Sequence, residues 1–161
     1  MENNRKIELL EKSLERLLEW IRSADSKIAP VLAIDTSMLA VLVVLVTSGG
    51  NRSSFGLVVF AAAALGLLIS LIFLLLAVFP RISGPGKSLI YFQDILGVSS
   101  DIYKEKLLNL TEGQYVDDLC KQCHRIAVIA GSKYKRVRLA MIFQFVSLVP
   151  WLLAVFMLYR G

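Results

Sequence analysis

Apolar positions at helical spacing open the chain. Over residues 1–27, spacings of three and four predict one amphipathic helix whose apolar stripe consists of Ile7, Leu10, Leu14, Leu17, Ile21, Ala24 and Ile28. No turn signal follows, so we expect this helix to continue into the apolar residues 28–48. Continued at the same spacing, the stripe reaches Asp35 and Leu42. One helical face therefore passes from water into an apolar span and carries a carboxylate.

Three apolar stretches, residues 28–48, 55–79 and 139–159, are long enough to cross a bilayer, which takes about 20 residues. A hydrophobic content of 56% and a mean hydropathy of +0.63 are too high for a small soluble domain. The sequence therefore predicts an all-α integral membrane protein with three transmembrane helices. Residues 1–27 form an amphipathic N-terminal helix in this prediction, and residues 80–138 form a helical cytoplasmic layer.

Positive charge is distributed unevenly around these spans. Of the 18 Lys and Arg residues, residues 1–27 hold six and residues 80–138 hold ten. Because positively charged flanks stay in the cytoplasm, we expect the N-terminus and residues 80–138 inside and the C-terminus outside. The net charge of +5 then reflects topology and contact with anionic lipid heads, and it does not indicate binding to a nucleic acid polymer.

Asp35 is the one acidic residue within the three spans. It lies roughly 10 Å deeper than Ile28 along a helix. A charged acid at the centre of a span costs about 2.5 to 3.5 kcal/mol, so we expect it to face protein or water. Two interpretations stand: Thr36, Ser37 or a lipid headgroup satisfies the carboxylate, or Asp35 makes a polar contact at an oligomer seam or pore lining.

The apolar stripe likewise has two interpretations. It packs onto the chain's own bundle, or it associates with further copies of the chain. In the second case Leu14, Ile21, Ile28 and Leu42 line the seam together with Asp35.

Local signals also predict where other helices start and how they pack. Ser99 caps a short helix that ends near Asn109, and Thr111 with Gln114 forms a capping box for a helix that continues as one rod into the third span. In the second span, small residues such as Gly66 predict a close helix approach. Pro30 either occupies the first turn of the first span or marks a kink.

The chain offers little catalytic or metal chemistry. We find no acid pair, no nucleophile with a base and no metal-ligand cluster, so we expect no enzyme, no cofactor and no metal. Residues 120–124 match a haem attachment pattern by letter, but His124 is the only histidine. We interpret Cys120 and Cys123 as reduced core residues on a helix face.

A basic run precedes the third span and consists of Lys133, Lys135, Arg136 and Arg138. Such residues form a collar that reaches the headgroup layer. Alternatively, they help to hold an anionic ligand together with Arg81, which follows the second span.

Motifs in order along residues 20–160 resemble the Pycsar transmembrane effector family. They are Ala24-Asp25-Ser26-Lys27, Phe79-Pro80-Arg81, Tyr91-Phe92-Gln93-Asp94-Ile95, Tyr103, Gln122 and Lys133-Tyr134. The resemblance implies a bacterial inner-membrane protein of antiphage defence with its C-terminus in the periplasm. It implies a response to a cyclic pyrimidine nucleotide, cyclic CMP or cyclic UMP, that impairs the membrane and causes growth arrest or death. The span pattern also resembles the SLATT-like pore-forming effectors.

The resemblance and the residues combine into one hypothesis. Arg81, Lys133 and Lys27 bind the phosphate of a cyclic nucleotide, and Tyr91 or Phe92 stacks on its base. Binding shifts the helices of a homo-oligomer in contact with membrane lipids and opens a leak at Asp35. The alternatives are a non-enzymatic membrane scaffold or accessory subunit, and a SLATT-like pore gated by another signal.

Overall fold

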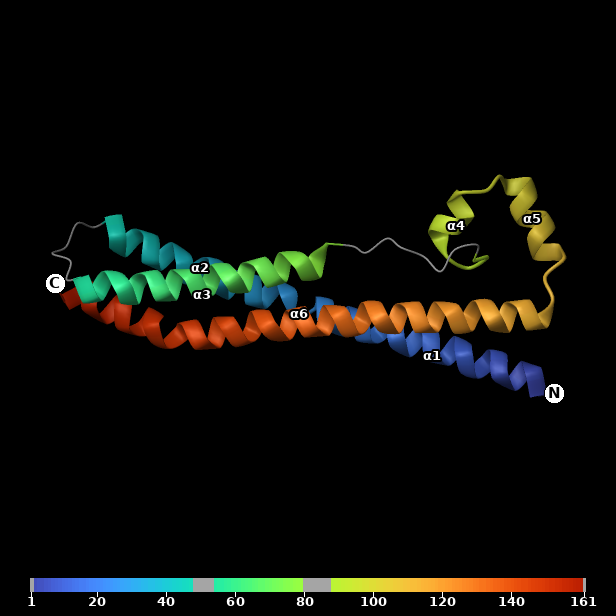
Figure 1. The fold of residues 1–161 in the computed structure, drawn as a ribbon, viewed down its shortest axis with the longest axis horizontal. Helices are drawn as coiled ribbons and strands as arrows, with labels where there is room; N and C mark the ends of the chain where they lie inside the picture. Colours follow the sequence, from blue (N-terminus) through green and yellow to red (C-terminus); the bar gives the residue numbers. More distant parts are fainter. Residues whose placement is uncertain (1, 48–53, 80–87, 161) are drawn as a thin grey trace. The chain divides into compact units, whose positions relative to one another are not determined.

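The structure, a computed structural model, describes residues 2–47, 54–79 and 88–160, and every regular element among them is a helix. In chain order the helices are α1 (Glu2–Asp25), α2 (Ile28–Thr47), α3 (Ser54–Val78), α4 (Phe92–Leu96), α5 (Ser100–Leu108) and α6 (Glu112–Arg160) (Figure 1). Three helical stretches, which contain α2, α3 and most of α6, are long and apolar enough to cross a membrane. The prediction of an all-α integral membrane protein with three transmembrane helices is therefore confirmed.

The chain forms two compact units. We call residues 24–79 and 133–161 the spanning unit, because they contain α2, α3 and the apolar part of α6. Residues 1–23 and 80–132 form the polar unit, which contains most of α1, α4, α5 and the first part of α6.

A two-residue turn, Ser26–Lys27, separates α1 from α2, so the expectation of an unbroken helix was wrong. The cause is Pro30, which has no N–H to offer the carbonyl of Ser26 four residues earlier and whose ring crowds that carbonyl. The turn tightens in response, and the Lys27 N–H donates to the Ala24 carbonyl at 3.3 Å. Pro30 then lies in the first turn of α2, where a missing N–H is tolerated.

The core of the spanning unit consists of two apolar clusters that α2, α3 and α6 build together, and Figure 1 shows these helices side by side. One cluster comprises Ile28, Val31, Leu74, Ala77, Val137 and Ala140, and the other comprises Met38, Leu42, Val59, Ala63, Leu67 and Ala154. The predicted close approach is present at Gly66, where an added Cβ would lie 2.0 Å from Ser147 Oγ. Trp151 Nε1 also donates to the Met38 carbonyl at 2.9 Å. Small residues thus let α3 pack tightly on α6.

The starts of α5 and α6 follow their predicted caps. Ser99 Oγ accepts from the Ile102 N–H at 3.5 Å. In the capping box, the Thr111 N–H donates to Gln114 Oε1 at 3.0 Å and the Gln114 N–H donates to Thr111 Oγ1 at 3.4 Å. The helix that follows runs for 49 residues and continues past Pro150. The prediction of a single rod into the third span is therefore confirmed.

Within the polar unit, the apolar stripe of α1 faces the first part of α6. The stripe residues of this unit are half-buried while their neighbours are exposed. Tyr115 Oη donates to Glu11 Oε1 at 2.8 Å, and Cys123 Sγ lies 3.5 Å from the Leu10 carbonyl oxygen. These contacts support the interpretation that the N-terminal helix packs on its own chain.

Candidate functional site

Lys133 and Lys27, two of the cations expected to bind a phosphate, lie in the spanning unit and have partners there. Lys133 Nζ is 2.5 Å from Asp25 Oδ1, and only 17% of the Lys133 side chain is exposed. Lys27 Nζ lies 5.5 Å from the centroid of the Tyr134 ring, a cation–π contact. Both contacts tie the α1–α2 turn to α6, so each lysine positions helices of this unit.

The remaining residues of the basic run differ from one another in their contacts. Arg136 donates to the carbonyl of Leu76 in the last turn of α3, where carbonyls lack a partner within the helix. Lys135 and Arg138 have exposed side chains. The run therefore acts partly as a set of helix-joining contacts and partly as an exposed cationic surface.

Tyr91 and Phe92, the aromatic residues expected to stack on a base, lie in the polar unit. Their ring centroids are 5.0 Å apart with the planes inclined by 54°, and Phe92 is 56% exposed. Arg81 lies outside the described residues. The aromatic pair and the two lysines belong to different units, so their joint role in binding stays a prediction.

Asp35 is fully buried in the spanning unit and contacts α3. Ser70 Oγ lies 2.6 Å from Asp35 Oδ2. Thr36 and Ser37 instead donate to the Ala33 carbonyl of their own helix. The interpretation that neighbouring hydroxyls satisfy Asp35 was therefore wrong, because its partner is 35 residues away along the chain.

The hydrogen bonds around Asp35 bear on the protonation state of its carboxyl group. Ser70 Oγ is within 2.6 Å of Asp35 Oδ2 and within 2.9 Å of the Ala140 carbonyl oxygen, but a hydroxyl has only one hydrogen. Either Ser70 shares its one hydrogen between the two oxygens, or Asp35 is protonated and donates to Ser70, which then donates to Ala140. Asp35 Oδ1 has no partner among the described residues. This geometry fits a neutral acid.

Asp35 belongs to a buried polar row that we define as Asp35, Ser70, Gln144 and Ser147. The row draws on α2, α3 and α6. Gln144 Nε2 donates to the Val31 carbonyl at 3.2 Å, and Ser147 Oγ donates to the Phe143 carbonyl at 2.7 Å. Polar side chains inside a membrane bundle are costly and mark pathways or interhelical contacts. The row is the one place where all three spanning helices turn described polar side chains inward.

The residues expected at an oligomer seam differ in their surroundings. Ile28 and Leu42 are buried in the two apolar clusters of the spanning unit, whereas Leu14 and Ile21 are half-buried on α1. Their contact with further copies of the chain stays a prediction.

The two cysteines are free thiols on α6, but only one of them approaches a core position. Cys123 is half-buried, and burial raises the pKa of its thiol. Cys120 is exposed, so its assignment to the core was wrong, and the buried positions next to it on α6 are Leu119 and Gln122.

A polar network centred on Ser88 organises the polar unit. The Ser88 side chain is buried, and its Oγ accepts from the N–H groups of Ile90 and Tyr91 and from Gln122 Nε2 at 2.8 to 3.1 Å. Ser88 Oγ also lies 3.0 Å from Asp118 Oδ2, to which it donates. The Ser88 N–H donates to Asp94 at 2.9 Å. This network fixes the turn before α4 on α6.

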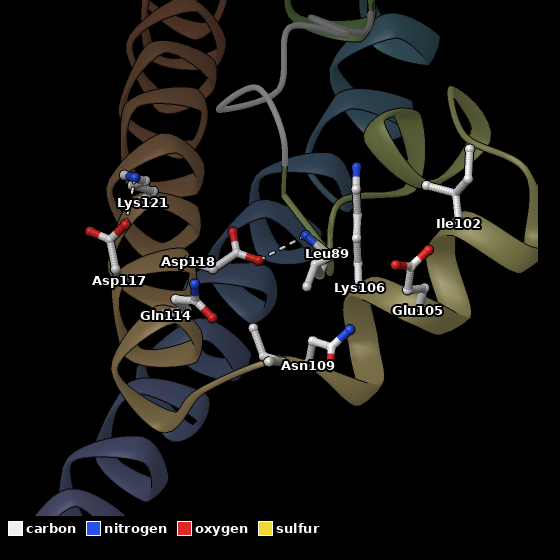
Figure 2. Close-up of a pocket in the computed structure, with 10 residues that line it drawn as sticks. Leu89, Ile102, Glu105, Lys106, Asn109, Gln114, Asp117, Asp118 and Lys121 are labelled. Carbon is white, nitrogen blue, oxygen red and sulfur yellow. Dashed lines mark hydrogen bonds and ion pairs between the residues drawn. The ribbon is translucent and has the colours of Figure 1, made fainter.

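Beside this network, α5 and α6 enclose a pocket of about 650 Å³ (Figure 2). Figure 2 shows Glu105 and Lys106 on the α5 side, Asp118 on the α6 side and Leu89 between them. The Leu89 N–H donates to Asp118 Oδ2 at 2.9 Å, so the hydrogen-bond network also forms the pocket wall. Lys121 pairs with Asp117 at 2.5 Å on the same rim.

Sequence reasoning missed this pocket and its network. Ser88 and Asp118 are 30 residues apart, and neither lies in a motif with characteristic spacing. The only signals were a pair of adjacent acids, Asp117 and Asp118, in the expected helix and the short helix that Ser99 caps.

The model of one protein family, described as the Pycsar effector protein domain, matches residues 9–160. Among curated proteins and among solved structures, nothing matches the chain. The family match covers nearly the whole sequence and includes both units. Pycsar effectors respond to cyclic nucleotides in general. The chain therefore belongs to the Pycsar effector family and is a membrane protein that acts as an antiphage defence effector.

Proposed function

We propose that this effector is a non-enzymatic protein of the bacterial inner membrane that responds to a cyclic nucleotide, cyclic CMP or cyclic UMP, by impairing the membrane. The response causes growth arrest or death of the infected cell. The observation that carries the proposal is the buried polar row of the spanning unit. A protein that only anchors itself in lipid has no need of a buried acid, which costs free energy in a bilayer.

In the resting state of this proposal, the three spanning helices cover the row and exclude water. Nucleotide binding favours a second arrangement of the helices, and its differential affinity for the two states sets the shift in population. In the second arrangement Asp35, Ser70, Gln144 and Ser147 face a water-filled path, which copies of the chain form together. Asp35 then ionises, because water and not lipid surrounds it.

The proposed topology places the N-terminus and residues 80–138 in the cytoplasm, where a nucleotide signal arises, and the C-terminus in the periplasm. The charge distribution supports it. Cys120 is an existing probe, because its exposed thiol lies in the segment proposed to be cytoplasmic. A membrane-impermeant thiol reagent should label Cys120 only after cells are permeabilised. Labelling of intact spheroplasts would instead place this segment in the periplasm and contradict the proposed topology.

The function is tested with the full chain in vesicles that trap a fluorescent dye. Adding cyclic CMP or cyclic UMP on both sides of the membrane should release the dye. Asp35→Asn keeps a donor for Ser70 but cannot ionise, so this variant should stay folded and lose most of the release. Thr36→Val, at an exposed position beside it, is the matched control and should behave as the parent. Absent release from the parent chain would refute the proposal and favour a scaffold, and release that does not depend on the nucleotide would refute it and favour a pore gated by another signal.

A further inference from the structure

We infer that the pocket between α5 and α6 is the nucleotide site, with Lys106 on the phosphate and Glu105 on an amino group of the base. The ligand is then a cyclic nucleotide with an amino-bearing pyrimidine, cytosine and not uracil. The ligand class rests on the proposed function, whereas the location and the base preference rest on the pocket.

The pocket suits a ligand of this size. Its volume of about 650 Å³ lies within the range of roughly 300 to 1,000 Å³ that holds small molecules. Leu89, Ile102 and Leu110 supply apolar lining, against which a planar base can pack. Five charged side chains surround this apolar part, three acidic and two basic, so binding of a phosphate depends on Lys106, because Lys121 is paired with Asp117.

Two charged side chains of the lining are free to bind a ligand. Lys121 pairs with Asp117, and Asp118 accepts from the Ser88 hydroxyl and the Leu89 N–H. Glu105 and Lys106 line the same pocket and have no side-chain partner among the described residues. The pocket therefore presents one unpaired cation and one unpaired carboxylate, next to each other on α5.

The unpaired ammonium of Lys106 determines where the phosphate binds. A charge-assisted bond from Lys to a phosphate oxygen is stronger than a neutral hydrogen bond. Lys106 and Leu89 also line a second, smaller cavity of about 240 Å³, so Lys106 lies where the two cavities meet. At this junction the ring of the cyclic phosphate can occupy the smaller cavity while the base occupies the larger one.

The unpaired carboxylate of Glu105 determines which base is accepted. An ionised carboxylate only accepts hydrogen bonds, and cytosine presents an amino donor where uracil presents a carbonyl acceptor. Uracil in the same pose would bring two acceptors together with no hydrogen between them, which leaves both unsatisfied. Discrimination between a donor and an acceptor at one such position is typically about 10-fold or more.

Binding at this site can also act on the fold of the polar unit. The α6 wall of the pocket is fixed by the buried Ser88 network, whereas Glu105 and Lys106 are exposed on the α5 wall. A ligand that bonds Lys106 and lies against Leu89 would hold α5 to α6. Because Tyr103 Oη already donates to the Leu89 carbonyl at 3.2 Å, the ligand would strengthen a contact that α5 makes without it.

Isothermal titration of the full chain in detergent with cyclic CMP and with cyclic UMP tests the site. Lys106→Gln should weaken cyclic CMP binding roughly 10- to 100-fold, the usual loss for a hydrogen bond to a charged group. Lys104→Gln is the matched control, because Lys104 is exposed on the same helix and lines neither cavity. Glu105→Gln, which offers both a donor and an acceptor, should reduce the preference for cyclic CMP over cyclic UMP.

The outcomes separate this inference from the function it rests on. If the parent chain binds cyclic CMP and Lys106→Gln binds it as tightly as Lys104→Gln does, the site lies elsewhere while the proposed function stands. Tighter binding of cyclic UMP than of cyclic CMP by the parent chain overturns the base assignment. If the parent chain neither binds a cyclic nucleotide nor releases dye in its presence, the proposed function fails, and this inference fails with it.

Discussion

Gly66 gives the sharpest test of how the spanning unit packs. In a Gly66→Ala variant the added Cβ would lie 2.0 Å from Ser147 Oγ and 3.2 Å from Ser147 Cβ. The hydroxyl can rotate away only by giving up its bond of 2.7 Å to the Phe143 carbonyl, and the contact with Cβ remains after rotation. The substitution therefore costs the Ser147–Phe143 hydrogen bond and requires a shift of a few tenths of an ångström between α3 and α6.

The loss of stability in Gly66→Ala is measured against a Gly→Ala change at an open helical position. Overpacking of this kind costs about 1 to 3 kcal/mol. Gly131→Ala serves as the control, because an added Cβ there meets nothing within 4 Å, and Ala gains up to about 1 kcal/mol over Gly in a helix. Gly66→Ala should therefore be about 1 to 3 kcal/mol less stable than Gly131→Ala, a difference in Tm of roughly 2 to 12 °C.

Thermal melting of the chain in detergent, followed by circular dichroism, measures this difference. The double variant Gly66→Ala with Ser147→Gly removes the clashing atoms and should recover at least about 1 kcal/mol relative to the sum of the single changes. Close packing of α3 on α6 is refuted if Gly66→Ala has the same Tm as Gly131→Ala, or if the double variant shows no coupling. In either case α3 and α6 would not be in close contact at this point.

Two further predictions concern single hydrogen bonds. Ser70→Ala leaves the buried Asp35 without its partner and should cost about 1 to 3 kcal/mol in the same melting experiment, whereas an unchanged Tm would contradict the buried contact. The hydrogen bond to Glu11 raises the pKa of Tyr115 above its usual value of 10.0, with burial as a smaller cause. The stabilisation is fully present below about pH 10 and is lost as pH rises through the folded-state pKa, so Tyr115→Phe should lose this alkaline step in melting temperature. An identical pH profile for the Phe variant would contradict it.

The sequence by itself determined the features whose signals are local. The spans follow from runs of apolar residues, and the stripe of α1 follows from periodicity within one helix. The start of α6 follows from Thr111 and Gln114, which contact each other across one turn. Pro30 was also a local signal, but the sequence predicted an unbroken helix there and did not place the turn at Ser26–Lys27.

Only the tertiary structure decided which distant residues meet. Asp35 with Ser70, Lys133 with Asp25, and Ser88 with Asp118 are pairs whose members lie far apart in the chain. No periodicity links such positions, because each pairing depends on how helices lie against one another and not on the rise within one helix. For the same reason, sequence reasoning found the polar residue inside the first span but neither its partner nor the pocket between α5 and α6.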